Sequence, residues 1–275
     1  MASNGVDPAI VEALKLDPDT AKMTTHGGSG FASTFKLVGT VTGGDGKQEQ
    51  RTFFVKTGSG ADAQVMFRGE HASLNAIHDA VPGFCHVRFP RADVLRLDGA
   101  ENGWRASWAD FYADNRLRAI LRAGVRANGA DAELERAVEA TAAKVVPRLL
   151  GDGHLRGVVP VVCHGDLWSG NHGIGRIVGG PEDGERRVEA VVFDPSAVYG
   201  HSEYDLGIMK MFGGFGAAFW REYGELVPKS EPVEEYDDRI ALYGLYHHLN
   251  HFAIFGGGYR AGAMSIMKRL LSKYG

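Results

Sequence analysis

Residues 164–171 have the sequence HGDLWSGN, a polar segment that predicts a loop between two apolar runs. The apolar run GVVPVVC at 157–163 precedes the loop and predicts a short buried strand that leads into it. A second apolar run, AVVF at 190–193, ends at Asp194, and the turn-rich residues between the loop and this run predict a hairpin. Asp166 and Asp194 are therefore expected at the same end of a small β-ribbon.

The spacing of three polar residues in the loop is typical of phosphoryl transfer. His164, Asp166 and Asn171 match H-x-D-x-x-x-x-N, in which the aspartate takes or orients a hydroxyl proton and the asparagine holds Mg²⁺. Asp194 supplies the second carboxylate that such a metal site requires. The alternative is that both segments are ordinary turns, since Asp, Gly and Pro favour turns. Their matching order and spacing favour the catalytic interpretation, with Asp166 as the base.

A helix predicted over residues 61–80 carries a carboxylate on its apolar face. Glu70 shares a stripe at helical spacing with Ala63 and Ile77. Because burial of an unpaired charge is costly, we expect a partner, and Lys56 is the only basic residue of the preceding strand FFVKT. A strand lysine paired with a helix glutamate holds nucleotide phosphates in kinases. The alternative is an ordinary half-buried ion pair.

A glycine-rich segment, HGGSG at 26–30, precedes a predicted hairpin with strands at 31–42 and 51–57. Backbone N–H groups of such a loop can cover phosphates, and the alternative is a flexible entry loop. The segment does not match the G-x-x-x-x-G-K-[ST] pattern, which disfavours a P-loop nucleotidase. The candidate nucleotide-binding residues here are Gly28, Ser29 and Gly30.

The composition excludes several classes of protein. The 275 residues are 44% hydrophobic and 23% charged, as in an ordinary globular protein, and their length suits two lobes. A net charge of −4 without any block of like charges disfavours nucleic acid as a partner, and no run is apolar enough to predict a membrane span. Only Cys85 and Cys163 are present, which predicts no disulfide framework and favours the cytoplasm.

The order of the predicted elements indicates an α+β fold. Strands dominate the first third, whereas helices are predicted from Ser107, over 131–150, and from about residue 203 to the end. Among the remaining features, His247 and His251 stand one helical turn apart, but no third zinc ligand accompanies them. Trp168 either stacks on a sugar or packs the loop.

Several segments together resemble the fructosamine-3-kinase / ketosamine-3-kinase (protein-ribulosamine 3-kinase) family, within the kinase-like superfamily that includes aminoglycoside and choline kinases. The matching strings are HGGSGFASTFK, FFVKTGSGADAQVMFRGEHASL, ENGWRASWADFYADNRL, HGDLWSGN, FDPSAVYGHSEYDLGIMKMFGGF and LYHHLNHFAIFGGGY.

This resemblance implies a bilobal kinase-like fold, with a nucleotide-binding lobe at 1–97 and a catalytic, substrate-binding lobe at 98–275. It implies ATP-dependent phosphorylation of the O3′ hydroxyl of a ketosamine, a lysine-bound sugar adduct, and hence a deglycating repair activity. The implied roles are Asp166 as base, Asn171 and Asp194 as Mg²⁺ ligands, Lys56 and Glu70 at the phosphates, Trp168 and His251 at the sugar, and Asp205 as a brace.

The sequence departs from the family pattern between Val94 and Trp104. Family members have further strands, an adenine-binding hinge and additional helix there, whereas this chain passes directly from FPRADVLRLDGA into ENGWRASW. We therefore expect a first lobe that is shortened on its hinge side. Two hypotheses stay open: an active ketosamine kinase, and a non-catalytic remnant that lacks the adenine hinge. Aminoglycoside or choline phosphotransfer is a third alternative, disfavoured by Trp168 and the YGHSEYDL string.

Overall fold

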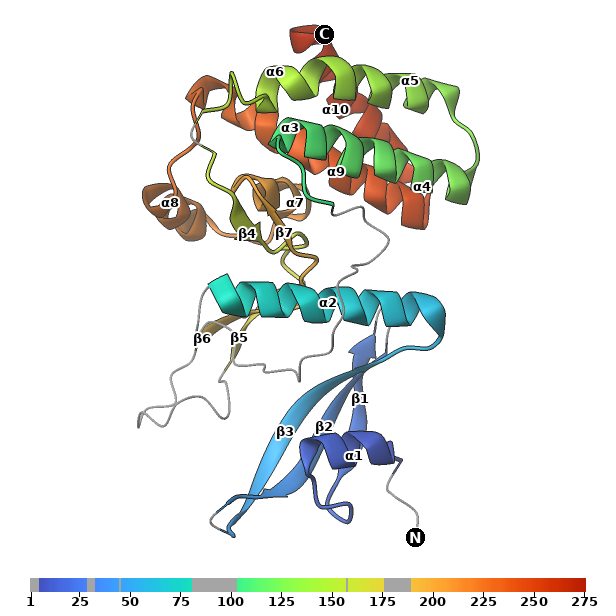
Figure 1. Cartoon of the computed structure of the whole chain (residues 1–275), viewed down its shortest axis with the longest axis vertical. Helices are drawn as coiled ribbons and strands as arrows, with labels where there is room; N and C mark the ends of the chain where they lie inside the picture. The colour runs from blue at the N-terminus through green and yellow to red at the C-terminus, as the bar shows by residue number, and fades with distance from the viewer. Residues whose placement is uncertain (1–4, 29–32, 45, 81–102, 157, 176–188) are drawn as a thin grey trace. The chain divides into compact units, whose positions relative to one another are not determined.

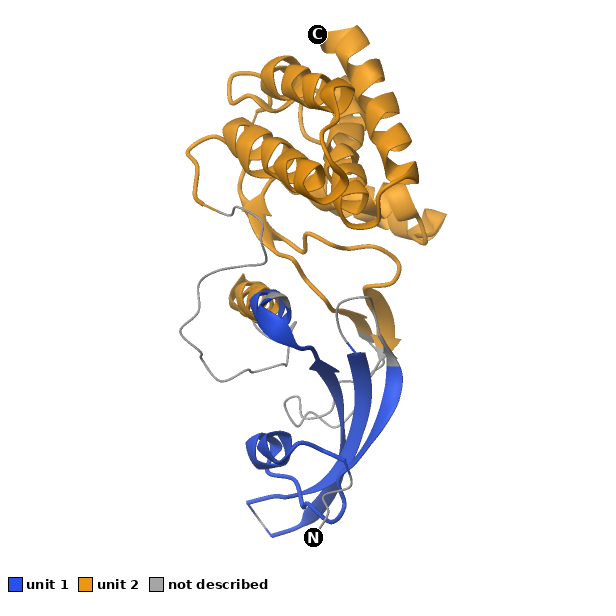
Figure 2. Cartoon of the chain, turned by 90° about the vertical axis from the view of Figure 1, so that its right-hand side faces the viewer, with its two compact units in different colours: residues 1–67, 178–181 blue, residues 68–177, 182–275 orange. Residues whose placement is uncertain are grey.

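The structure is a computed structural model that describes residues 5–28, 33–44, 46–80, 103–156, 158–175 and 189–275. The chain forms two compact units, which Figure 2 colours separately: Met1–Phe67 with Val178–Pro181, and Arg68–Ile177 with Glu182–Gly275. This division lies inside one helix. The predicted lobe boundary at residue 97 lies outside the described residues and stays a prediction.

The first unit contains a three-stranded antiparallel sheet in the order β1(Lys22–Gly28), β2(Ser33–Thr42) and β3(Gln48–Thr57). The predicted hairpin is confirmed, with Phe35 opposite Val55. The sequence analysis did not predict β1, which precedes the hairpin and takes up the start of the glycine-rich segment. Its polar, threonine-rich sequence KMTTHGG lacks the apolar alternation of a typical strand.

A small core fixes the helix α1(Pro8–Leu14) on this unit. The Asp7 side chain accepts a hydrogen bond from the N–H of Ala9 and so begins the helix, and Lys15, at φ 53°, ends it. Apolar side chains of α1 and the following loop pack with the fully buried Leu37 of β2. The buried members of this core are Val6, Val11, Leu16, Ala21 and Leu37.

The long helix α2(Gly60–Ala80) confirms the helix predicted over 61–80. Ala63 and Ile77 are buried, and Glu70, on the same stripe, is half-buried. Ser73 is also buried, with only 2% of its surface exposed. The inward face of α2 therefore carries two polar side chains, of which the periodicity singled out only Glu70.

The second unit contains a helical bundle and two short pairs of strands (Figure 1). Its helical elements are α3(Trp108–Phe111), η1(Tyr112–Arg118), α4(Ala119–Asn128), α5(Ala132–Ala140), η2(Thr141–Val145), α6(Val146–Leu150), α7(Tyr204–Phe212), α8(Ala217–Leu226), η3(Val233–Glu235), α9(Tyr236–Phe255) and α10(Gly258–Tyr274). Ser107 caps α3 as expected, and η1 and η2 are π-helical turns inside otherwise continuous helices. The predicted helices are confirmed, and with them the α+β class.

Two antiparallel pairs of strands lie between α6 and α7. The strand β5(His172–Gly175) pairs with β6(Glu189–Val192), which confirms the predicted hairpin. The strand β4(Val161–Cys163) is shorter than the predicted 157–163, and it pairs with β7(Val198–Gly200), which the sequence analysis did not predict. The three residues of β7 are too few to show a period.

A buried ion pair joins α7 to α9. The guanidinium of Arg239, which is 0% exposed, donates to the Glu203 carboxylate at 2.7 and 3.1 Å. It also donates to the carbonyls of Pro232 and Ser230 at 2.8 and 2.7 Å. Every acceptor of this cation is thus a buried or half-buried oxygen of the same unit, and the pair is well hydrogen-bonded.

No helix in the described part of the chain is long and apolar enough to cross a bilayer.

Replacing Arg239 by alanine leaves the Glu203 carboxylate buried without its counter-charge. We expect a loss of about 3–5 kcal/mol in the free energy of unfolding, measured by urea denaturation followed by circular dichroism. Lys268→Ala is the control, because its contact with Glu133 is between side chains that are 69% and 52% exposed, and solvent screens it. Equal effects of the two substitutions would contradict a stabilising role for the buried pair.

Candidate active site

The loop HGDLWSGN lies between β4 and β5 and is anchored by one carboxylate. Asp205, in the first turn of α7, accepts hydrogen bonds from the backbone N–H of His164 and of Gly165, both at 2.7 Å. Burial raises the pKa of the Asp205 carboxyl to about 6, although both N–H groups oppose this shift. The carboxylate therefore fixes the start of the loop against the helix bundle.

Gly165 brings the loop against the segment that follows Asp194. Its φ of 82° suits glycine, and a Cβ there would lie 1.8 Å from the carbonyl oxygen of Ser196. The N–H of Ser196 donates to the carbonyl of His164 at 2.9 Å. The two segments on which the predicted site depends are thus in direct backbone contact, and only glycine fits at position 165.

The imidazole of His164 links the same two segments. Its Nε2 lies 3.0 Å from the carbonyl oxygen of Phe193, which can only accept, so we assign the proton to Nε2. Its Nδ1 then accepts from the N–H of Asp166 at 3.3 Å. Burial lowers the pKa of His164 to about 4, so the ring is neutral at physiological pH. His164 is a brace and carries no charge into the site.

Asp166 and Asn171 are brought together as the spacing predicted. The Asn171 side-chain amide donates to the Asp166 carboxylate at 2.9 Å and to its backbone carbonyl at 2.8 Å. Burial raises the pKa of the Asp166 carboxyl to about 7, and the charge of Asp194 acts in the same direction. A carboxylate with this pKa is suited to accept a proton near neutral pH.

Asp194 follows β6, as predicted, with a left-handed φ of 58°. The N–H of its neighbour Phe193 donates to the carbonyl of Asn171 at 3.0 Å, which places the two predicted metal ligands on adjoining backbone. Since the Asn171 amide nitrogen points to Asp166, its amide oxygen faces away from that carboxylate. An amide oxygen and a carboxylate are hard oxygen donors of the kind that Mg²⁺ prefers, so the donor set fits a divalent cation.

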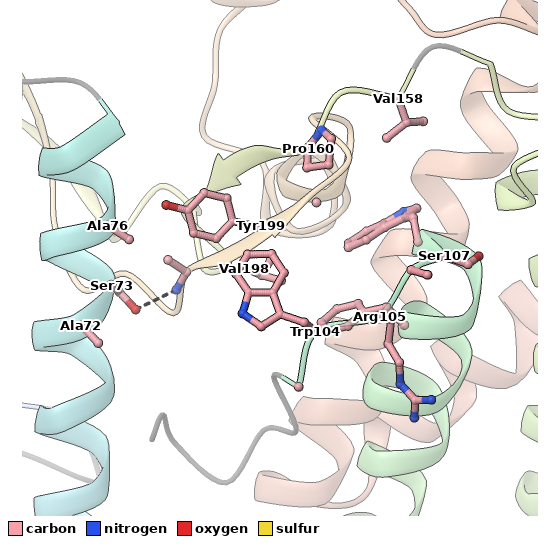
Figure 3. A pocket seen from close by; sticks show the side chains of 16 residues that line it. Ala72, Ser73, Ala76, Trp104, Arg105, Ser107, Val158, Pro160, Val198 and Tyr199 are labelled. Atoms are coloured by element: carbon pink, nitrogen blue, oxygen red, sulfur yellow. Dashed lines mark hydrogen bonds between the residues drawn. The ribbon is translucent and has the colours of Figure 1, made fainter. Parts of the chain in front are cut away.

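Ser73 connects α2 to the segment that carries Asp194. Its Oγ donates to the carbonyl of Gly69 at 2.8 Å and accepts from the N–H of Ala197 at 2.9 Å (Figure 3). Glu70 stands one helical turn before Ser73. The sequence analysis did not identify Ser73, because a lone serine in a helix has no spacing that marks it.

The remaining predicted nucleotide-binding residues lie in the first unit, Met1–Phe67, or outside the described residues. Lys56 is half-buried on β3, and Gly28 pairs with Ser33 at the end of β1. Ser29 and Gly30 lie outside the described residues. The pairing of Lys56 with Glu70 would join the two units, and it stays a prediction.

The rings of the two predicted sugar contacts, Trp168 and His251, both lie against the ring of Phe212. The Trp168 ring is 5.6 Å from that of Phe212, which is 5.1 Å from that of His251. Gly170 and Gly214 allow this arrangement, because a Cβ at either position would overlap Trp168 or Ser169, respectively. Trp168 is 37% exposed, so it packs the loop and still presents a ring to solvent.

A separate cavity of about 280 Å³ lies between the second half of α2, the residues before α3, and β7 (Figure 3). Its walls are mainly apolar and include Trp104, Trp108 and Tyr199. None of the predicted site residues lines it. The predicted site at the loop 164–171 is therefore distinct from this cavity.

His247 and His251 stand one helical turn apart on α9. No group of three His, Cys, Asp or Glu side chains in the described ranges could hold a metal ion. His251 Nδ1 donates to the carbonyl of His247 at 2.8 Å. His247 itself is 2% exposed, and its Nε2 has no hydrogen-bond partner among the described residues. Burial lowers the pKa of His247 to about 3.

The comparisons with known proteins agree on one family. Residues 89–273 match the family model described as fructosamine kinase. The chain is 37% identical over 211 residues to a Synechocystis sp. protein named as a probable ketoamine kinase. The aligned residues cover 74% of this chain and 64% of the Synechocystis protein. This chain is 37% identical over 169 residues to the ketosamine-3-kinase of Mus musculus, covering 62% and 48%. The chain thus spans about half to two thirds of these relatives.

One solved structure shows the fold. A protein of Thermobifida fusca YX-ER1, provisionally named as a fructosamine-3-kinase, superposes with a TM-score of 0.70 at 23% identity. The match covers 98% of this chain and 100% of that chain. The expected kinase-like α+β fold is confirmed.

Replacing His247 by phenylalanine should flatten the pH dependence of stability. A histidine whose folded pKa is lowered stabilises the fold above its unfolded pKa of about 6.5, and that stability is lost as the pH falls. From pH 7 to pH 5 this loss is about 2 kcal/mol for one imidazole that stays neutral in the fold. We expect the variant to lose about 2 kcal/mol less than the wild type over this range, measured by urea denaturation. An unchanged difference would show that His247 is protonated in the fold.

Proposed function

The chain belongs to the fructosamine kinase family, and from this premise we propose that it phosphorylates ketosamines with ATP. The observation that carries the proposal is the hydrogen-bonded pair of Asp166 and Asn171, with Asp194 on the adjoining backbone. We propose the O3′ hydroxyl of a ribulosamine or fructosamine adduct on lysine as the acceptor. Phosphorylation there would serve deglycation repair, and action in the cytoplasm stays a prediction.

Asp166 would accept the proton of the sugar hydroxyl as the hydroxyl oxygen bonds to the γ-phosphorus of ATP. The bond between the γ-phosphorus and the β,γ-bridging oxygen breaks, and ADP leaves. The Asn171 amide holds one carboxylate oxygen of Asp166 at 2.9 Å, which leaves the other oxygen for the hydroxyl. Because its pKa is raised to about 7, a large fraction of Asp166 is ionised at neutral pH, and its conjugate acid still holds the proton well. Asp166 thus acts as the base, and Asn171 orients it.

Asn171 and Asp194 would hold Mg²⁺, as their hard oxygen donors support. When bound, the cation offsets the negative charge of the phosphates during transfer. Lys56 and Glu70 would position the phosphates, with the backbone of Gly28, Ser29 and Gly30 above them. Ser73 would keep the helix of Glu70 and the segment of Asp194 in register, through its bond to Ala197.

The test is a phosphoryl-transfer assay with MgATP and a fructosyl- or ribulosyl-amine. We expect Asp166→Asn to lower kcat by about 10²–10⁴-fold, because the amide cannot accept the hydroxyl proton. Asp152→Asn, in an exposed loop, is the control and should leave kcat unchanged.

Three outcomes contradict this proposal. Full activity of Asp166→Asn would show that another group is the base. If the wild type shows neither turnover nor a rise in melting temperature with MgATP, the alternative of a non-catalytic remnant is correct, because a ligand of the folded state must stabilise it. Turnover of an aminoglycoside or choline without a ketosamine would select the third alternative.

A further inference from the structure

Five aromatic side chains form a continuous row that starts two residues after Asp166 and ends where α9 meets α10. We call this row the ring strip: Trp168, Phe212, His251, Phe255 and Tyr259. From Trp168 the ring centroids step 5.6 Å to Phe212 and 5.1 Å to His251. From His251 they step 5.7 Å to Phe255 and 5.1 Å to Tyr259. The row belongs entirely to the helical unit.

Three rings of the ring strip are exposed to solvent, and the other two, His251 and Tyr259, are half-buried. Trp168 and Phe212 are each 37% exposed, and Phe255 is 63% exposed. Phe212 ends α7 and Phe255 ends α9, and each is followed by a glycine with a φ of 68° that stops the helix. Single exposed rings are common in proteins, but a contiguous row beside a polar site indicates a binding surface.

The chemistry of the ring strip suits a ligand that is cationic and partly apolar. The faces of aromatic rings attract cations. The Lys and Arg side chains that stack on rings in the described part of this unit do so elsewhere, as with Lys210 over Trp220 and Lys229 over Tyr236. His251 uses its Nδ1–H on the His247 carbonyl, so we assign the lone pair to its Nε2, which can accept a further hydrogen bond.

We propose that the ring strip binds the amine-bearing half of the ketosamine. The secondary amine of such an adduct is protonated at neutral pH, and it lies over Phe212 and His251 when the sugar is at Trp168. The alkyl chain attached to that amine lies along Phe255. This inference rests on the proposed function, which places the sugar at Asp166. The ring strip would favour binding of adducts of long alkyl amines, such as the lysine side chain, over adducts of short amines.

The length of the amine is tested with Phe255→Ala and two substrates, the ketosamines of Nα-acetyl-lysine and of methylamine. We expect KM for the lysine adduct to rise about fivefold at unchanged kcat, because the apolar contact that is lost is the same in the ground and transition states. Both constants for the methylamine adduct should stay unchanged. Leu226→Ala, a 74% exposed apolar residue at the end of α8, is the matched control. An equal change for both substrates would overturn the role of Phe255.

The charge of the amine is tested with Phe212→Leu, which keeps an apolar side chain and removes the ring. Calorimetry compares binding of the lysine ketosamine with that of its N-acetylated form, in which the nitrogen is uncharged. We expect the variant to lose about fivefold in affinity for the charged form only. An equal loss for both forms would show that Phe212 contributes packing without a cation contact, and would overturn this part of the proposal.

The two proposals fail in different ways. If the wild type binds ketosamines with these dependences but phosphorylates none, the proposed function is wrong and the ring strip stands. If it phosphorylates both adducts equally well and Phe255→Ala changes neither, the ring strip is wrong and the proposed function stands.

Discussion

The two hydrogen bonds that Asp205 accepts from the backbone of His164 and Gly165 are the contact on which the site depends. They hold the loop to the first turn of α7, which is itself packed on α9. With the loop start fixed, Gly165 comes against Ser196, and the segment after Asp194 is placed by the same contact. Because both N–H groups are charge-assisted donors to one buried carboxylate, the loop has little freedom to shift.

The helical unit combines buried carboxylates with buried neutral histidines, and their burial makes the stability of the fold depend on pH in opposite directions. Burial raises the pKa values of Asp166 and Asp205, whereas it lowers those of His164 and His247. Ionising these carboxylates therefore destabilises the fold as the pH rises, and protonating these histidines destabilises it as the pH falls. The fully hydrogen-bonded pair of Glu203 and Arg239 avoids this conflict, because its two charges are partners within the same core.

Much of the architecture followed from local patterns. Apolar periodicity located α2 and the helices after Ser107, and the turn-rich residues before Asp194 located the β5–β6 hairpin. Three features escaped such reasoning for different reasons. The strand β1 is polar, the strand β7 has only three residues, and Ser73 is a single polar residue in a helix whose partner, Ala197, is distant in sequence. None of these has a period or a spacing to detect.

The sequence alone determined the family, the α+β class and the identity of the polar residues at the loop, since motif spacing and periodicity are properties of neighbouring residues. Only the tertiary structure decided that the Asn171 amide donates to the Asp166 carboxylate and that burial raises the pKa of Asp166. It also decided that none of the predicted site residues lines the cavity near Trp104. It also assembled the row of rings from Trp168 to Tyr259 out of a loop and three helices. Contacts and desolvation depend on which distant segments pack together, and no local pattern encodes that choice.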